Sequence, residues 1–146
     1  MVRIVADQES LDACFAVRRE VFCVEQNVSE ELEWDGLDEV CTHFIALPEE
    51  GAPADAALGT ARLWISEEGK AKAQRVAVHK RARGQGIGHL LMAALEAEAA
   101  RLGHQEVILG AQVSALGFYE KRGYQAYGDL FDDAGIPHRM MKLSLG

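Results

Sequence analysis

The chain has 146 residues, a size typical of a domain with a single core, and we expect one domain over residues 1–146. Its formal net charge of −8 disfavours nucleic acid as a partner, and no apolar run approaches the roughly 18 residues of a membrane span. Three cysteines without a Cys-x-x-Cys pair, and an N-terminus without a long apolar segment, favour a cytoplasmic protein that lacks disulfides.

Apolar periodicity and turn residues predict an α/β fold with a sheet of mixed direction, in which hairpins precede a strand–helix–strand unit. One helix is predicted over residues 11–22 with Ser10 as its N-cap, a second from about 88 to 102, and a short third over 114–121. Strands are predicted at 3–6, 40–47, 57–65, 71–78, 106–111, 124–129 and 139–145. The periodicity fails over residues 23–39, which we interpret as a functional loop.

Charge is distributed unevenly along the chain. Six basic and no acidic residues lie between Lys70 and Arg83, whereas eight acidic and no basic residues lie between Glu20 and Glu39. Two solvated faces could produce this segregation. We favour a site with a phosphate-bearing ligand near the basic residues and a cationic substrate near the acidic ones, because the basic stretch adjoins a glycine-rich segment.

That segment, residues 83–88, reads Arg-Gly-Gln-Gly-Ile-Gly and lies between a predicted strand and a predicted helix. Alternate glycines let backbone N–H groups approach a ligand closely, and the helix start adds unpaired donors and a positive dipole end. Phosphate groups bind such a site readily. The spacing matches neither the P-loop, which needs Gly-x-x-x-x-Gly-Lys, nor the dinucleotide fingerprint Gly-x-Gly-x-x-Gly.

Instead, the spacing Arg/Gln-x-x-Gly-x-Gly, met by Arg83, Gly86 and Gly88, resembles the coenzyme A pyrophosphate loop of the GCN5-related N-acetyltransferases, the GNAT superfamily. A second segment, Gln112 to Tyr124, is similar to the superfamily region in which an Asn or Gln and a Tyr flank coenzyme A. Further strings resemble a bacterial subgroup, the ElaA/YjcF-like proteins: Arg18-x-x-Val21-Phe22-x-x-Glu25-Gln26, Glu33-x-Asp35-x-x-Asp38, and Gly135-Ile136-Pro137-His138.

The resemblance implies a GNAT-like, mixed and mostly antiparallel sheet with helices on both faces, and acetyl-CoA as the acyl donor. The strand before the glycines would pair with the pantetheine amides like an added strand, and an N–H of Val76 or Ala77 would donate to the thioester oxygen. Lys80, Arg81 or Arg83 would reach the 3′-phosphate. The cofactor-binding residues that the resemblance implies are Val76, Ala77, Val78, Arg83, Gly84, Gln85, Gly86, Ile87, Gly88, Gln112 and Tyr119.

The resemblance also implies two catalytic roles. Tyr119 matches the general acid that protonates the leaving sulfur, although a packed aromatic residue would have the same sequence signature. Glu25, which lies in the subgroup's own motif, is the first candidate for the general base, and Gln26 beside it could orient the substrate. The other base candidates, acting directly or through water, are Glu33, Asp35, His43 and His138.

Together these features predict an N-acetyltransferase that moves acetyl from acetyl-CoA to a primary amine by direct attack, since no cysteine matches a nucleophile. A non-catalytic coenzyme A-binding sensor, or an enzyme using another acyl-CoA, would share the motifs. The expected partner is a small-molecule or peptide amine, without nucleic acid or membrane; the oligomeric state stays open, with a homodimer as one option. Cys41 and His43 could share a strand face, but no further ligand completes a tetrahedral set, so no metal is expected.

Overall fold

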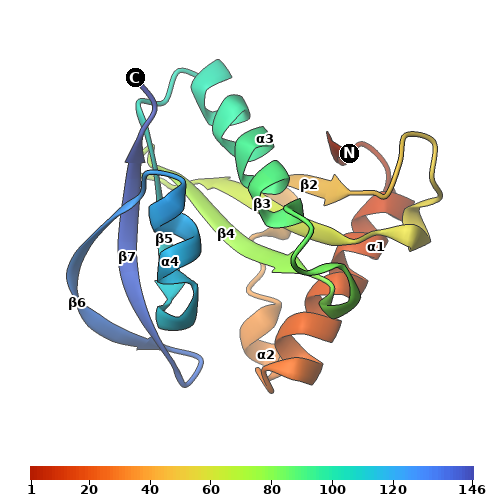
Figure 1. Cartoon of the computed structure of the whole chain (residues 1–146), viewed down its shortest axis with the longest axis horizontal. Coiled ribbons are helices and arrows are strands. Elements are labelled where there is room, and N and C mark those ends of the chain that lie inside the picture. The colour runs from red at the N-terminus through yellow and green to blue at the C-terminus, as the bar shows by residue number, and fades with distance from the viewer.

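The computed structural model describes residues 1–146 and contains one seven-stranded sheet (Figure 1). Its strands are β1 (Val2–Ile4), β2 (Thr42–Ala46), β3 (Gly59–Ile65), β4 (Ala71–Val78), β5 (Glu106–Gln112), β6 (Gln125–Asp133) and β7 (Ile136–Ser144). They lie in the order β1-β2-β3-β4-β5-β7-β6, and every neighbouring pair is antiparallel except β4 and β5. The predicted mixed, mostly antiparallel sheet is therefore confirmed.

The helices are α1 (Gln8–Arg18), α2 (Glu30–Glu33), α3 (Ile87–Arg101) and α4 (Leu116–Lys121), with short 3₁₀ turns at Asp38–Val40, Ala54–Ala56, Lys80–Ala82 and Val113–Ala115. The first helix begins earlier than predicted, because the Asp7 carboxylate, and not Ser10, caps it by accepting the Ser10 N–H at 2.8 Å. After Arg18 the helix widens into a π-helix, η1 (Arg19–Glu25), a form that is frequent at functional sites.

Helices cover both faces of the sheet, as the family resemblance implied. On one face, α3 packs Leu91 and Leu95 against Phe44 and other strand residues in the larger apolar cluster. On the other face, α1 packs Cys14 and Val17 against Ile45 in a smaller cluster. The neighbours Phe44 and Ile45 belong to different clusters because successive strand side chains point to opposite faces. None of the helices combines the length and apolarity that crossing a bilayer requires.

The sheet opens between β4 and β5. These strands pair only at Ala71 with Val107 and at Lys72 with Ile108. Further along β4 a bulge interrupts its pairing with β3, and Arg75 there has a φ of +54°, which L-residues rarely adopt. Because β4 turns away from β5 beyond the two pairs, the centre of the sheet leaves room for a cavity.

Candidate active site

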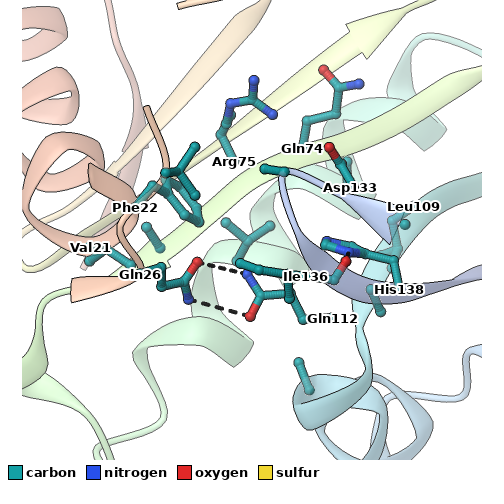
Figure 2. A pocket seen from close by; sticks show the side chains of 18 of the residues that line it. Val21, Phe22, Gln26, Gln74, Arg75, Leu109, Gln112, Asp133, Ile136 and His138 are labelled. Carbon is teal, nitrogen blue, oxygen red and sulfur yellow. Dashed lines mark hydrogen bonds between the residues drawn. The ribbon is translucent and has the colours of Figure 1, made fainter. Parts of the chain in front are cut away.

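The cavity between β4 and β5 has a volume of about 390 Å³ (Figure 2). Its central walls are residues 73–78 of β4 and 109–112 of β5. Phe22 and other residues of η1 and α2 close one side, while Ile136 and His138 from the β6–β7 hairpin close the other. Segments from both ends of the chain therefore meet at the break in the sheet.

The expected donor-binding strand, Val76 to Val78, lies along this cavity. On one side, β3 pairs with it at Ala77 and Val78. On the other side, no strand pairs with it, because β5 has already separated. The unpaired edge can therefore accept the amide groups of an extended ligand as another strand would.

The glycine-rich segment leads from β4 to α3, and its geometry fits an anion. Gly84 and Gly86 have φ values of +81° and +79°, and no heavy atom lies within 4 Å of where a Cβ would stand on either. The backbone N–H groups from Gly84 to His89 donate no hydrogen bond within the protein. They lie at the positive end of α3, a 15-residue helix, so they can hold a phosphate group.

Gly88 has a different reason to be glycine. It has a helical backbone in the first turn of α3, and a Cβ there would lie 3.0 Å from Cζ and 3.1 Å from Cε1 of Phe118. The missing side chain therefore allows α3 to approach α4, which is a packing requirement. This packing reason stands beside the close approach of a ligand, which we predict from the sequence.

Gly88→Ala should therefore depend on Phe118. Overpacking costs about 1–3 kcal/mol, while alanine gains about 1 kcal/mol over glycine in a helix. We expect the change in the free energy of unfolding caused by Gly88→Ala to be more favourable by about 1 kcal/mol or more when Phe118 is replaced by leucine. Urea unfolding of the wild type, the two single variants and the double variant gives this coupling free energy. A coupling near zero would contradict the packing explanation.

Two side-chain bridges tie η1 and the residue after it to the donor-binding elements. Glu25 accepts two hydrogen bonds from the Arg83 guanidinium, each 2.9 Å long. Gln26 and Gln112 exchange amide hydrogen bonds of 3.3 and 2.8 Å across the cavity (Figure 2). The first candidate base is thus paired with an expected coenzyme A ligand, and its side chain does not line the cavity.

Tyr119, from α4, does line the cavity and is only 8% exposed. Its hydroxyl has no hydrogen-bond partner in the protein, while the ring packs edge-on against Phe118 and Tyr124. Burial raises the pKa of Tyr119 to about 12, so the phenol keeps its proton at neutral pH. The site therefore holds a protonated donor whose hydroxyl is free.

The acidic stretch forms a buried ionic cluster with arginines. Arg18 donates to Glu33 at 2.8 Å and to Asp38 at 2.7 Å. Arg62 donates to Asp38 at 2.8 Å and to Asp35 at 3.0 Å. Arg75 Nε lies 3.2 Å from Glu33 Oε2, without the alignment of a hydrogen bond. Arg18 and Arg62 are 1% exposed and Glu33 is 3% exposed, so the charges compensate one another inside the protein.

These pairings set the protonation of the carboxylates. Burial alone would raise the pKa of Asp35, but hydrogen bonds from Arg62 and the Leu37 N–H, with the charges of Arg62 and Arg75, lower it to about 2. For Glu33, burial is strong enough to raise the pKa despite the guanidinium groups of Arg75 and Arg18. We expected the acidic stretch between Glu20 and Glu39 to attract a cationic substrate, but three of its eight acidic residues, Glu33, Asp35 and Asp38, are paired with arginines inside the protein.

Motif analysis does not identify every residue at the site. It does not single out Arg62, which pairs with the buried carboxylates. Nor does it single out Asp133, which lines the cavity. A charged residue in the middle of the apolar strand Gly59–Ile65 could have indicated a buried partner for Arg62. No comparable pattern marks Asp133, because its place depends on how β6 and β7 pair.

The comparisons with known proteins agree with this architecture. The family described as "Acetyltransferase (GNAT) domain" matches residues 5–145. The chain is 40% identical over 141 residues to the uncharacterized N-acetyltransferase YjcF of Bacillus subtilis (strain 168). The alignment covers 95% of this chain and 96% of YjcF.

Solved structures share the whole fold, among them the following two. An acyl-CoA N-acyltransferase from Pseudomonas aeruginosa superposes with a TM-score of 0.82 at 32% identity, covering 97% of this chain and 96% of that one. ElaA of Escherichia coli gives a TM-score of 0.80 at 26% identity, covering 97% and 99%.

The open sheet and these relatives together define an acyl-CoA N-acyltransferase fold. The chain belongs to the GNAT acetyltransferase family, whose members use acyl-CoA, and the predicted similarity to the ElaA/YjcF-like proteins is confirmed.

Proposed function

We propose that this protein transfers the acetyl group of acetyl-CoA to a primary amine, on a small molecule or a peptide, by direct attack of the amine on the thioester. One observation carries the proposal: the same cavity is lined by the unpaired edge of β4 and by Tyr119, whose phenol is protonated. The unpaired N–H groups of the glycine-rich segment follow β4 after the 3₁₀ turn Lys80–Ala82. Donor binding and proton donation thus have groups in one place.

The donor would bind along β4 and the glycine-rich segment. Val76, Ala77 and Val78 would hydrogen bond the pantetheine arm, and an N–H of Val76 or Ala77 would stabilise the negative charge that develops on the thioester oxygen. The N–H groups of Gly84, Gln85, Gly86, Ile87 and Gly88 would bind the pyrophosphate, with Arg83 and Gln112 beside it.

The reaction forms an N–C bond and breaks the C–S bond. A base removes one proton from the amine nitrogen, and the Tyr119 hydroxyl gives a proton to sulfur as the thiol leaves. Direct attack is favoured over an acyl-enzyme because Cys14, Cys23 and Cys41 do not line the cavity. Burial also raises the pKa of all three thiols, which lowers the fraction present as the reactive thiolate.

The direct test combines acetyl-CoA with a panel of primary amines and follows release of free thiol. Steady release that depends on the amine supports acetyl transfer. A protein that binds acetyl-CoA in calorimetry but releases no thiol with any amine would instead be a sensor of coenzyme A. Faster release from a longer acyl-CoA would replace acetyl by that group.

Gly86→Val should weaken acetyl-CoA binding by about 2 kcal/mol or more, roughly 30-fold in Kd. Valine is strained at the φ of +79°, so the N–H groups around it would move from their present directions. Isothermal titration calorimetry measures the effect. Gly69→Val is the matched control, because Gly69 also has a φ of +79° with open space around it but lies in the β3–β4 turn.

The control should lose a similar amount of stability, about 1–3 kcal/mol, and keep its affinity for acetyl-CoA. A folded Gly86→Val variant with unchanged affinity would contradict the assignment of the glycine-rich segment to the donor.

A further inference from the structure

The base that acetyl transfer requires can be chosen from the geometry of the cavity. The motifs in the sequence point to five candidates: Glu25, Glu33, Asp35, His43 and His138. The cavity is lined by only two of them, Glu33 and His138. A group that takes a proton from the attacking amine must come within hydrogen-bond reach of it, so these two have the required position.

The other three have fixed partners elsewhere. Both carboxylate oxygens of Glu25 accept from Arg83. Asp35 is held by Arg62, and its pKa of about 2 makes it a poor base. His43 directs Nε2 to the Asp38 carbonyl at 2.9 Å, and burial lowers its pKa.

Glu33 lines the cavity but is also held. Its carboxylate is 2.8 Å from Arg18 Nε and 3.2 Å from Arg75 Nε, and its side chain is 3% exposed. Proton uptake by Glu33 would leave two neighbouring guanidinium groups without their counter-charge. Both contacts are made by Oε2, and although burial raises the pKa of Glu33, its place in the buried ionic cluster makes it a weaker candidate than a group without an ionic partner.

His138 is held in a way that leaves one nitrogen free. It lies on β7 opposite Gln112 of β5, is 8% exposed, and its ring faces the cavity among the lining side chains (Figure 2). Nδ1 is 2.7 Å from the carbonyl oxygen of Ile136. A carbonyl can only accept, so Nδ1 carries the hydrogen, and in the neutral ring Nε2 has the lone pair.

Nothing in the protein occupies that lone pair. No protein group hydrogen bonds to Nε2, and the ring is packed at 30° against Phe131, with centroids 5.7 Å apart. The backbone contact and the aromatic neighbour together fix the tautomer and the orientation of the ring. An imidazole with a fixed ring and a free nitrogen in a cavity is positioned to accept a proton from a bound amine.

Other ionisable groups share the cavity and must be distinguished from His138. They are Glu33 of α2, Arg75 of β4, Arg83 before α3, Tyr119 of α4 and Asp133 of β6. Among them only Asp133 is a carboxylate without an ion-pair partner, and it is exposed at the hairpin. Its exposed side chain lacks the fixed orientation that the Ile136 carbonyl and the Phe131 ring give to His138, so Asp133 is the weaker candidate.

We propose that Nε2 of His138 is the general base that takes the proton from the acceptor amine as its nitrogen bonds to the acetyl carbon. The inference rests on the proposed acetyl transfer. Tyr119 gives its proton to sulfur. After the products leave, the proton on Nε2 passes to solvent and the Tyr119 phenolate takes a proton from solvent, so each turnover restores both groups.

The kinetic test uses ethylamine as acceptor and acetyl-CoA as donor. His138→Ala should lower kcat/KM for ethylamine by about 10²-fold or more, while the Kd for acetyl-CoA changes less than about twofold. Added imidazole should restore a saturable part of the rate by occupying the space left by the ring. The matched control is His104→Ala, in the turn between α3 and β5, which should keep its rate and show no response to imidazole.

A second measurement does not depend on turnover. Nitrogen-15 NMR of the imidazole rings in the wild-type protein alone should show His138 with hydrogen on Nδ1 and none on Nε2 at a pH where the ring is neutral. Hydrogen on Nε2 would overturn the proposal whatever the kinetics. The signal is assigned by its loss in His138→Ala.

The kinetic outcomes also separate the two proposals. Suppose that the wild-type protein acetylates ethylamine. His138 is then not the base if His138→Ala keeps the wild-type rate, or if its rate falls and imidazole does not restore it. A large loss confined to Asp133→Asn would assign the role to Asp133. If wild type binds acetyl-CoA but acetylates no amine, acetyl transfer itself fails, and His138 has no base role with it.

Discussion

Replacing Tyr119 with phenylalanine should lower kcat about 100-fold when the chemical step limits turnover. The substitution removes only the hydroxyl, which has no partner in the protein, so the packing against Phe118 and Tyr124 should persist. Because burial raises the pKa of Tyr119 to about 12, the lost group is a phenol that keeps its proton until sulfur takes it. Steady-state thiol release gives kcat, and calorimetry should show nearly unchanged affinity for acetyl-CoA.

The loss should be smaller for an acyl donor whose thiol is more acidic, because such a leaving group needs the proton less. Tyr124→Phe is the matched control, since its hydroxyl donates to Glu96 at 2.8 Å and does not line the cavity. Full kcat in Tyr119→Phe would return this residue to a structural role. Equal losses with both donors would indicate that the hydroxyl positions the thioester and does not protonate sulfur.

Arg18→Met should reduce the free energy of unfolding by about 3–5 kcal/mol. Methionine keeps apolar bulk beside Phe15 and Trp34, against which the guanidinium is packed, but removes the charge. Glu33 would then be buried without its closest partner, and Asp38 would lose its 2.7 Å hydrogen bond. Urea unfolding followed by circular dichroism measures the change.

The adjacent Arg19 provides a control that differs mainly in burial. It pairs with Glu30 at 3.0 Å, but the two side chains are 54% and 60% exposed. Arg19→Met should therefore cost less than about 1 kcal/mol. Adding Glu33→Gln to Arg18→Met should recover part of the loss by removing the stranded charge. Equal effects of the two arginine substitutions would show that the ionic cluster contributes no more than a surface pair.

Features that depend on neighbours in the chain were predicted correctly from the sequence. The strand–turn–helix order around residues 83–88 follows from local rules, since Gly84 and Gly86 have left-handed φ values that glycine adopts without strain. The mixed sheet followed from apolar periodicity together with the family resemblance. The first helix was placed too late, because Asp7 and Ser10 both qualify as caps and only the backbone distinguishes them.

Contacts between distant segments could be decided only by the tertiary structure. Arg18 and Arg62 meet Glu33, Asp35 and Asp38 over separations of 15 to 27 residues, so the sequence showed an acidic stretch and not its neutralisation. Gly88 has the same local pattern as Gly86, yet its cause is a ring on α4. The preference for His138 over Glu25 depends on the register of β7 against β5 and on the pairing of Glu25 with Arg83. Linear motifs show neither the register nor the pairing. The packing of the strands and of η1 determines which groups face a shared cavity.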